Sequence, residues 1–317
     1  EPHRAYIEGE GLRAGKDIEK VTVPSYLPDN EIVREDLLDY AYEIEWFDRH
    51  LGQMLEKLEE IGELENTLIV VTSDNGMPFP RVKGQMYEPD LNLPMALCLK
   101  EKTEGGRVIE DLVNFIDLAP TFLEAAEIEV PSQMEGKSLM NIIKSDKNGE
   151  IDETRNRVYL GRERHDLGRR NDFGYPVRCI RTKQYLYIRN SKPERWPAGN
   201  PETGFTNCDS SPTKSLILKQ HEENNDDYFN LSFGKRPGEE LYDIKKDQEC
   251  MNNLAYKEKY SELKKNLWQE LKDKLKETGD PRIFGNGDVF DEEYEYQGDP
   301  PHSWKAYEEG WWKSQKF

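Results

Sequence analysis

The sequence predicts an α/β fold in which part of a doubly wound sheet, flanked by helices, precedes a smaller domain with an antiparallel sheet. Three observations support this prediction. Apolar residues at helical spacing over 31–61 lead directly into a β-branched run at 68–72. A second apolar run at 94–99 precedes another helical pattern at 109–128. Beyond about residue 144, short β-type runs separated by polar turns replace this alternation.

Residues 1–144 are expected to form a portion of the α/β domain. Their first helix has clear end signals, because Asp29 or Asn30 can cap its start and Gly62 follows its last turn. The pattern at 109–128 also predicts a helix, bent or restarted around its proline. Helix, strand, loop, strand and helix in this order are typical of a doubly wound sheet.

Residues 145–280 are expected to form the smaller α+β domain. The runs "RVYLGR", "VRCIRT" and "YLYIRN" predict strands of an antiparallel sheet. Leucines at every fourth position give the segment 260–277 one apolar helical face. The acidic, aromatic tail 281–317 is expected to wrap the surface. Its tryptophans are Trp304, Trp311 and Trp312.

Composition excludes several classes of protein. The chain carries 44 Lys and Arg against 63 Asp and Glu, a net charge of −19, which argues against binding nucleic acid. No apolar run reaches the roughly 18 residues of a membrane span. The four cysteines are widely spaced and lack a CxxC pair, so a zinc ribbon is not expected. Residues 155–195 are locally basic, with twelve Lys and Arg against four Asp and Glu, and this part of the chain could bind an anion.

A carboxylate and an amide, Asp74 and Asn75, follow the predicted strand at 68–72 directly. Open α/β sheets bind ligands outside the carboxyl ends of their strands. Carboxylate and amide oxygens suit calcium or magnesium better than zinc. An Asx turn would give the same tetrapeptide, Ser-Asp-Asn-Gly. This stretch alone therefore leaves a metal site and an ordinary turn both open.

Three blocks in order resemble the sulfatase family of the alkaline-phosphatase superfamily. They are "NTLIVVTSDNG", "FIDLAPTFLEAAEI" followed by "EGKSL", and "ELYDIKKDQECMNNLA". The last block has Gln248 where the family usually has proline. Together with "EPHR" and "DNGMPFP", they make the heparan N-sulfatase-like members (N-sulfoglucosamine sulfohydrolases) the most similar group. The resemblance covers most of residues 1–280 and implies a sulfatase-type sheet.

The resemblance also implies roles for individual residues. Asp74 and Asn75 would be ligands of a calcium ion (Ca2+) that holds the substrate's sulfate. Lys83, in "PRVKGQMYEP", would contact a sulfate oxygen, where a positive charge stabilises the transferring group. His3, in "EPHR", would lie close to the leaving oxygen or nitrogen and donate a proton to it.

His165, Arg178 and Arg164 are the candidate substrate-binding residues. They belong to the basic stretch, and planar guanidinium groups suit sulfates and carboxylates. In this family, side chains of the second domain line the rim of the substrate pocket. A solvated, charged strand edge is the alternative interpretation of the same cluster.

One central motif of the family has no counterpart here. Its nucleophile is a formylglycine made from the first residue of a [Cys/Ser]-x-Pro-x-Arg motif, and no cysteine here has proline two positions later. The stretch most similar to this motif, "SSPTK" at 210–214, has Lys in place of Arg and is interpreted as a loop. The paired aspartates of the family's first strand are also missing. The chain is therefore interpreted as the C-terminal part of a sulfatase, inactive alone and completed by a missing N-terminal segment.

The sequence thus predicts a hydrolase of sulfate esters or sulfamates on a glycan, which by resemblance is periplasmic, secreted or lysosomal. A phosphatase or phosphodiesterase of the same superfamily is one alternative. Such enzymes commonly have two metals and many histidines, whereas only five His occur here and none adjoins Asp74. A non-catalytic glycan-binding remnant is the other alternative.

Overall fold

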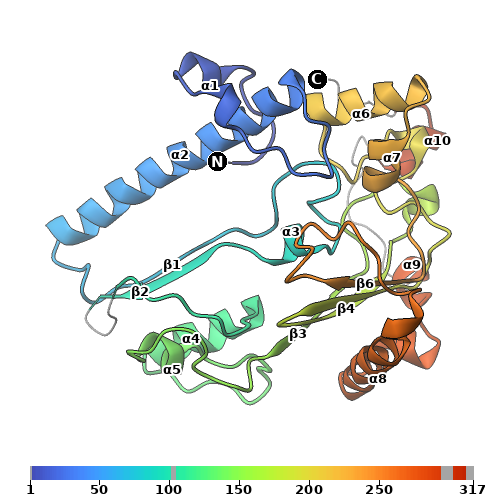
Figure 1. Cartoon of the computed structure of the whole chain (residues 1–317). Helices are drawn as coiled ribbons and strands as arrows, with labels where there is room; N and C mark the ends of the chain where they lie inside the picture. Colours follow the sequence, from blue (N-terminus) through green and yellow to red (C-terminus); the bar gives the residue numbers. More distant parts are fainter. Residues whose placement is uncertain (1, 101–104, 294–302, 312–317) are drawn as a thin grey trace.

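The computed structural model describes residues 2–100, 105–293 and 303–311. A long helix, α2 (Glu31–Glu60), lies on one side of the two-stranded ladder of β1 (Leu68–Thr72) and β2 (Met95–Leu99). The shorter helices α4 (Leu118–Ala125) and α5 (Met140–Ile143) lie on the other side (Figure 1). The first unit is therefore layered helix, strands, helix.

The remaining elements are short or belong to the second unit. The other helices are α1 (Glu10–Arg13), α3 (Glu88–Leu91), α6 (Pro212–Glu222), α7 (Asp227–Ser232), α8 (Ser261–Glu277), α9 (Val289–Glu292) and α10 (Trp304–Glu308). Single 3-10 turns are η1 (Ile18–Lys20), η2 (Phe115–Asp117), η3 (Arg170–Asp172), η4 (Pro201–Thr203), η5 (Glu258–Tyr260) and η6 (Pro281–Phe284).

Helix α2 is capped by Asn30, whose side chain accepts from the Val33 amide at 3.1 Å. Only the first third of the helix is buried, where it packs against α1 and α6. From residue 41 onward no α2 side chain is fully buried, and the helix projects beyond the rest of the chain (Figure 1). The second half of α2 thus keeps apolar side chains in contact with solvent.

Strands β1 and β2 pair antiparallel, with Leu68 opposite Leu99. Alternate residues point to opposite faces of the ladder. One face, with Leu68, Leu97 and Leu99, packs on buried residues of α5 and on Leu139 before it. The other face includes Cys98, which is exposed.

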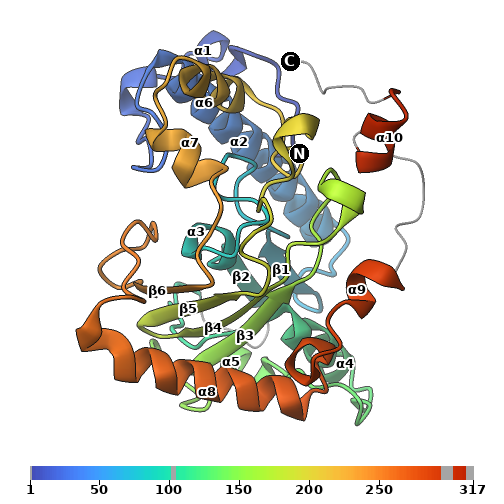
Figure 2. The ribbon, with the colours of Figure 1, turned by 90° about the vertical axis from the view of Figure 1, so that its right-hand side faces the viewer.

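The second unit is a four-stranded antiparallel sheet in the order β3-β4-β5-β6. Its strands are β3 (Arg157–Arg162), β4 (Val177–Thr182), β5 (Tyr185–Asn190) and β6 (Glu239–Asp243). Helix α8 lies across one face of this sheet (Figure 2), where Leu267 and Leu271 pack against Tyr187. On the other face, Met86 and Tyr87 pack against the sheet. The two units therefore share a core at the loop that follows β1.

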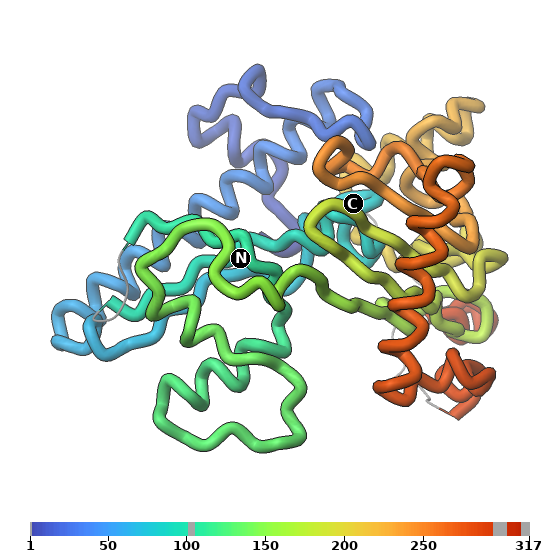
Figure 3. The backbone as a smooth tube through the Cα atoms, turned by 60° about the horizontal axis from the view of Figure 1, so that its bottom comes forward, coloured from blue at the N-terminus to red at the C-terminus, as the bar shows by residue number. Residues whose placement is uncertain are grey.

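A third core joins the N-terminal segment to α6 and α7. Phe205, Phe229 and Phe233 are buried there together with Val33 and Leu37 of α2. The segment 105–155 runs along the opposite side of the molecule (Figure 3). A cleft lined by residues of this segment, of β3 and of α8 lies between them. In the tail, Trp304 is buried and its amide donates to Asp172 at 2.6 Å, whereas Trp312 lies outside the described residues.

Most predicted elements are confirmed, and two predictions are wrong. The helices at 31–61 and 260–277 and the strands at 68–72 and 94–99 are present within one residue of their expected ends. Residues 109–114, however, are not helical, because Asn114 caps η2 and Pro120 can be accommodated only in the first turn of α4. The stretch "SSPTK" is not a loop, since Ser211 caps helix α6.

Candidate functional site

The turn that follows β1 presents two oxygen-bearing side chains. Asp74 is exposed, and its carboxylate makes no hydrogen bond or ion pair within the described part of the chain. The side-chain nitrogen of Asn75 donates to the Gly76 carbonyl at 2.8 Å, and no described residue donates a hydrogen bond to its side-chain oxygen. Oxygens of this kind fit a hard cation such as calcium.

These two residues are only part of a metal site. Calcium takes six to eight oxygen ligands in proteins. Within residues 2–100, 105–293 and 303–311, no cluster of three or more His, Cys, Asp or Glu side chains could hold a metal ion. Further ligands for a cation at Asp74 would therefore have to come from water, substrate or other residues.

The buried Asp90 holds this turn against the loop that carries Lys83. Its carboxylate accepts from the Gly76 amide at 2.9 Å and from the Gln85 amide at 3.2 Å. Burial raises the pKa of Asp90, and the backbone hydrogen bond from Gly76 opposes this shift. Gly76 is required here, because a Cβ would lie 2.6 Å from the Pro89 carbonyl oxygen.

Lys83 lies between two side chains from distant parts of the chain. Its ammonium donates to Asp209 at 2.8 Å, and it lies 3.4 Å from His3 Nε2. His3 Nδ1 is 2.6 Å from the Arg4 carbonyl oxygen. A carbonyl only accepts, so Nδ1 carries the proton and Nε2 turns its lone pair toward Lys83. The structure thus brings together the two residues predicted to be catalytic.

The segment that carries His3 is anchored by Arg4. The Arg4 guanidinium forms a buried ion pair with Asp36 of α2 and donates to the Pro78 carbonyl at 3.3 Å. It also lies 4.4 Å from the ring centre of Tyr6 and 4.5 Å from that of Phe79. These contacts fix the N-terminal segment beside the loop after β1.

His165 packs directly over Gly84, next to Lys83. Gly84 has φ of 74°, and a Cβ there would lie 2.6 Å from His165 Cδ2. Burial against this loop lowers the pKa of His165 to about 4, and the positive charges of Arg162 and Lys83 act in the same direction. The shift favours the neutral imidazole, whose ring packs against Gly84 although the residue as a whole is exposed.

Two family models match the sequence of this chain. The model described as "Sulfatase" matches residues 5–128, and that described as "N-sulphoglucosamine sulphohydrolase, C-terminal" matches residues 82–197. Their overlap covers the loop that carries Lys83. Together the two models match residues 5–197 of the chain as sulfatase sequence. The resemblance inferred from its sequence blocks is thereby confirmed.

Relatives of the chain are sulfatases as well. An ulvan-active sulfatase from Formosa agariphila is 30% identical over 254 residues, which are 78% of this chain and 40% of that protein. Human N-sulphoglucosamine sulphohydrolase is 26% identical over 296 residues, 89% of this chain and 56% of that protein. The chain thus spans about half the length of the curated relatives that it matches.

Solved structures show the fold. One protein, bound to its substrate D-glucosamine-2-N,6-O-disulfate, matches with a TM-score of 0.54 and 24% identity over 82% of this chain and 43% of that one. A 2-O glycosaminoglycan sulfatase matches with a TM-score of 0.54 and 19% identity over 84% and 46%. The predicted α/β class, with part of a sulfatase-type sheet and a smaller antiparallel domain, is confirmed.

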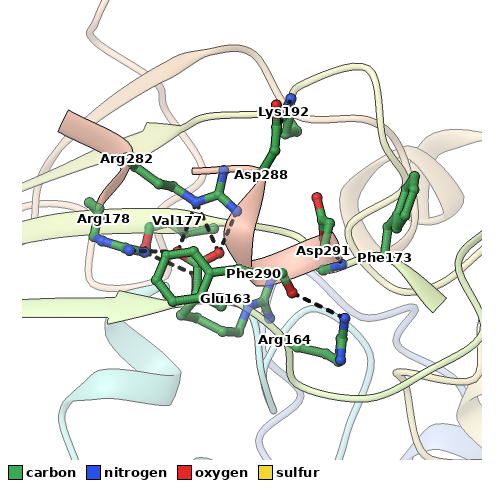
Figure 4. Close-up of polar contacts among 12 residues, drawn as sticks. Glu163, Arg164, Phe173, Val177, Arg178, Lys192, Arg282, Asp288, Phe290 and Asp291 are labelled. Atoms are coloured by element: carbon green, nitrogen blue, oxygen red, sulfur yellow. Dashed lines mark hydrogen bonds and ion pairs between the residues drawn. The ribbon is translucent and has the colours of Figure 1, made fainter. Parts of the chain in front are cut away.

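The other two sulfatase rim candidates make different contacts. Arg178 of β4 forms ion pairs with Glu163 and with Asp280, and Arg282 shares Glu163 (Figure 4). Arg164 donates to the Phe290 carbonyl at 3.4 Å. These contacts tie the sheet to the segment 280–290. They do not place either guanidinium beside Lys83, so the substrate-binding role of both arginines stays a prediction.

Sequence reasoning missed several residues that build this candidate site. Asp36 falls between Val33 and Leu37 on the apolar face of α2, and a carboxylate in that position signals a buried partner. Asp90 and Asp209 gave no comparable signal. Their partners are recognisable only when distant loops are brought together.

Proposed function

We propose that the chain is the C-terminal part of a sulfatase that hydrolyses sulfate esters or sulfamates of a glycan. The observation that carries the proposal is the meeting of His3, Lys83 and His165 beside the Asp74-Asn75 turn. This combines a fixed positive charge, imidazole nitrogens and free carboxylate and amide oxygens. Such groups suit a reaction in which a sulfate group is held and transferred.

Each of these side chains has a chemical task in the proposal. The Lys83 ammonium donates a hydrogen bond to a sulfate oxygen and stabilises the charge that develops on the transferring group. His3 takes up a proton at Nε2 and gives it to the leaving oxygen or nitrogen. A calcium ion held by Asp74 and Asn75 would neutralise part of the sulfate charge.

The remaining parts of the site would come from a preceding segment. We propose that this segment supplies the formylglycine nucleophile and further calcium ligands. It would also cover the second half of α2, where Ile44, Trp46, Phe47 and Met54 are between 41% and 63% exposed. Clustered exposure of large apolar side chains is typical of a surface that contacts another part of the protein.

A phosphatase or phosphodiesterase with this fold is the main alternative. Two-metal enzymes of that kind need several His, Asp or Glu side chains around each ion. The family models and the relatives that match this chain are described as sulfatases, which favours the sulfatase. Among the residues that the structure describes, no helix has both the length and the apolar character needed to cross a bilayer.

The test is sulfate release by the complete protein, including its upstream segment. Sulfated glycan oligosaccharides and the matching phosphate esters are the substrates. Lys83→Ala and His3→Ala are each expected to lower kcat about 10²-fold, because each removes a group that acts on the transferring or leaving atom. Lys20→Ala is the matched control, since Lys20 forms an exposed pair with Asp17.

Four results would contradict this proposal. Near-normal turnover in both alanine variants would remove Lys83 and His3 from the chemistry. Release of phosphate without sulfate would establish the phosphatase, and glycan binding without turnover would establish a binding protein. Sulfate release by residues 1–317 alone would show that the nucleophile lies within this chain.

A further inference from the structure

Asp209 is the closest carboxylate partner of Lys83. One of its oxygens, Oδ2, accepts from the Lys83 ammonium at 2.8 Å, and the two side chains are 25% and 13% exposed. The other oxygen, Oδ1, accepts no hydrogen bond from residues that the structure describes. Asp209 also influences His165 electrostatically. The carboxylate therefore lies inside the site and retains hydrogen-bonding capacity.

The geometry at Lys83 leaves one donor for a ligand. A lysine ammonium has three N–H donors and no acceptor. One donor is directed to Asp209 Oδ2, and a second faces the lone pair of His3 Nε2 at 3.4 Å. The direction of the third donor is thereby set by the other two. Asp209 and His3 together orient the ammonium before any ligand binds.

The loop that carries Asp209 is itself held firmly. The buried Lys214 ammonium donates to the carbonyl oxygens of Phe205 at 2.9 Å and Cys208 at 2.8 Å. Ser211 caps α6 by accepting from the Lys214 amide at 3.0 Å. The residues on both sides of Asp209 are therefore fixed to the start of α6. The Asp209 carboxylate is thus positioned by a rigid element.

We propose that Asp209 is a positioning and specificity-determining residue of this site. It holds the Lys83 ammonium so that one N–H is directed at the sulfate group. Its negative charge disfavours a second anionic group beside that sulfate, because like charges brought together at a binding site oppose association. Its free oxygen can accept a hydrogen bond from a sugar hydroxyl or amine. The preferred substrate is thus a sugar with a single sulfate at this position and a neutral or cationic neighbouring group.

The inference rests on the proposed function and is tested by binding of inorganic sulfate to the complete protein. Asp209→Asn keeps an acceptor for Lys83 and removes the charge, so sulfate should bind about tenfold more tightly. Asp209→Ala removes both the acceptor and the charge, so it should bind sulfate more weakly than Asp209→Asn does. Isothermal titration calorimetry gives both constants. Asp226→Asn is the matched control, because Asp226 is an exposed partner of His221 elsewhere on the surface.

The substrate preference gives a second readout. For a sugar that the wild type hydrolyses, the ratio of kcat/KM for its doubly and singly sulfated forms should rise about tenfold in Asp209→Asn. A merely structural role would lower both values together. Unchanged or weaker sulfate binding and an unchanged ratio in Asp209→Asn would overturn the inference. Absence of sulfate binding and release in the wild type would instead overturn the proposed function.

Discussion

Removal of Arg4 is expected to destabilise the protein more than any surface substitution. The Arg4 and Asp36 side chains are 5% and 2% exposed, so their ion pair is shielded from water. Asp36 also accepts from the Thr213 hydroxyl and amide at the start of α6. Among the described residues, Arg4→Ala would leave Thr213 as the one remaining donor to the buried Asp36 carboxylate. One pair thus joins the N-terminal segment, α2 and α6.

The expected magnitude follows from this burial. Removing one partner of a buried ion pair costs about 3–5 kcal/mol, because the remaining charge stays desolvated. Loss of the guanidinium over Tyr6 and Phe79 adds roughly 1 kcal/mol. At about 2–4 °C per kcal/mol for a domain of this size, the melting temperature should fall by about 10 °C or more. His3 would lose its neighbouring anchor at the same time.

Differential scanning calorimetry of the complete protein measures this effect. Lys20→Ala removes an exposed ion pair with Asp17 and should change the free energy of unfolding by less than about 1 kcal/mol. The double variant Arg4→Met/Asp36→Leu should recover much of the loss, since apolar residues of similar size can replace a buried pair. The recovery will be incomplete, because the Thr213 hydroxyl loses its acceptor.

A small effect would refute this reasoning. If Arg4→Ala lowered the melting temperature no more than Lys20→Ala does, the Arg4–Asp36 pair would not be buried in solution. If the double variant were as unstable as Arg4→Ala, packing of the guanidinium stem rather than the unpaired Asp36 charge would explain the loss.

Two further predictions concern the turn after β1 and the histidine beside it. Calcium should raise the melting temperature of the complete protein, and Asp74→Ala should abolish that rise; an unchanged response would contradict the metal assignment. The folded-state pKa of His165 is lowered to about 4, so the unfolded chain binds more protons as the pH falls from about 6.5 to 4 and stability decreases there. In His165→Gln the free energy of unfolding should decrease less over this pH range than in the wild type. The difference should be below about 1 kcal/mol, since the residue is partly exposed. If the wild type and His165→Gln lost the same stability between pH 7 and pH 4, the lowered pKa of His165 would be contradicted.

The elements predicted well are those whose signals are local. The strands at 157–162, 177–182 and 185–190 have the bounds of the runs that predicted them, because β-branched and aromatic residues between polar turns favour extended backbone over a few positions. Helix α2 was predicted from its caps and apolar spacing. Helix α6 was missed because its apolar residues, Leu216 to Leu218, are consecutive and give no helical period.

The sequence by itself determined the α/β class, the sulfatase blocks and the candidate residues Asp74, Asn75, Lys83 and His3. Only the tertiary structure decided which charges meet. Lys83 and Asp209 are 126 positions apart, and their pairing depends on two loops from different units. The guanidinium groups of Arg178 and Arg164 are of the kind that binds sulfate. In the structure, however, they contact Asp280 and Phe290 of the segment 280–290. Electrostatic partnership depends on distance in space, and local sequence patterns carry no information about that distance.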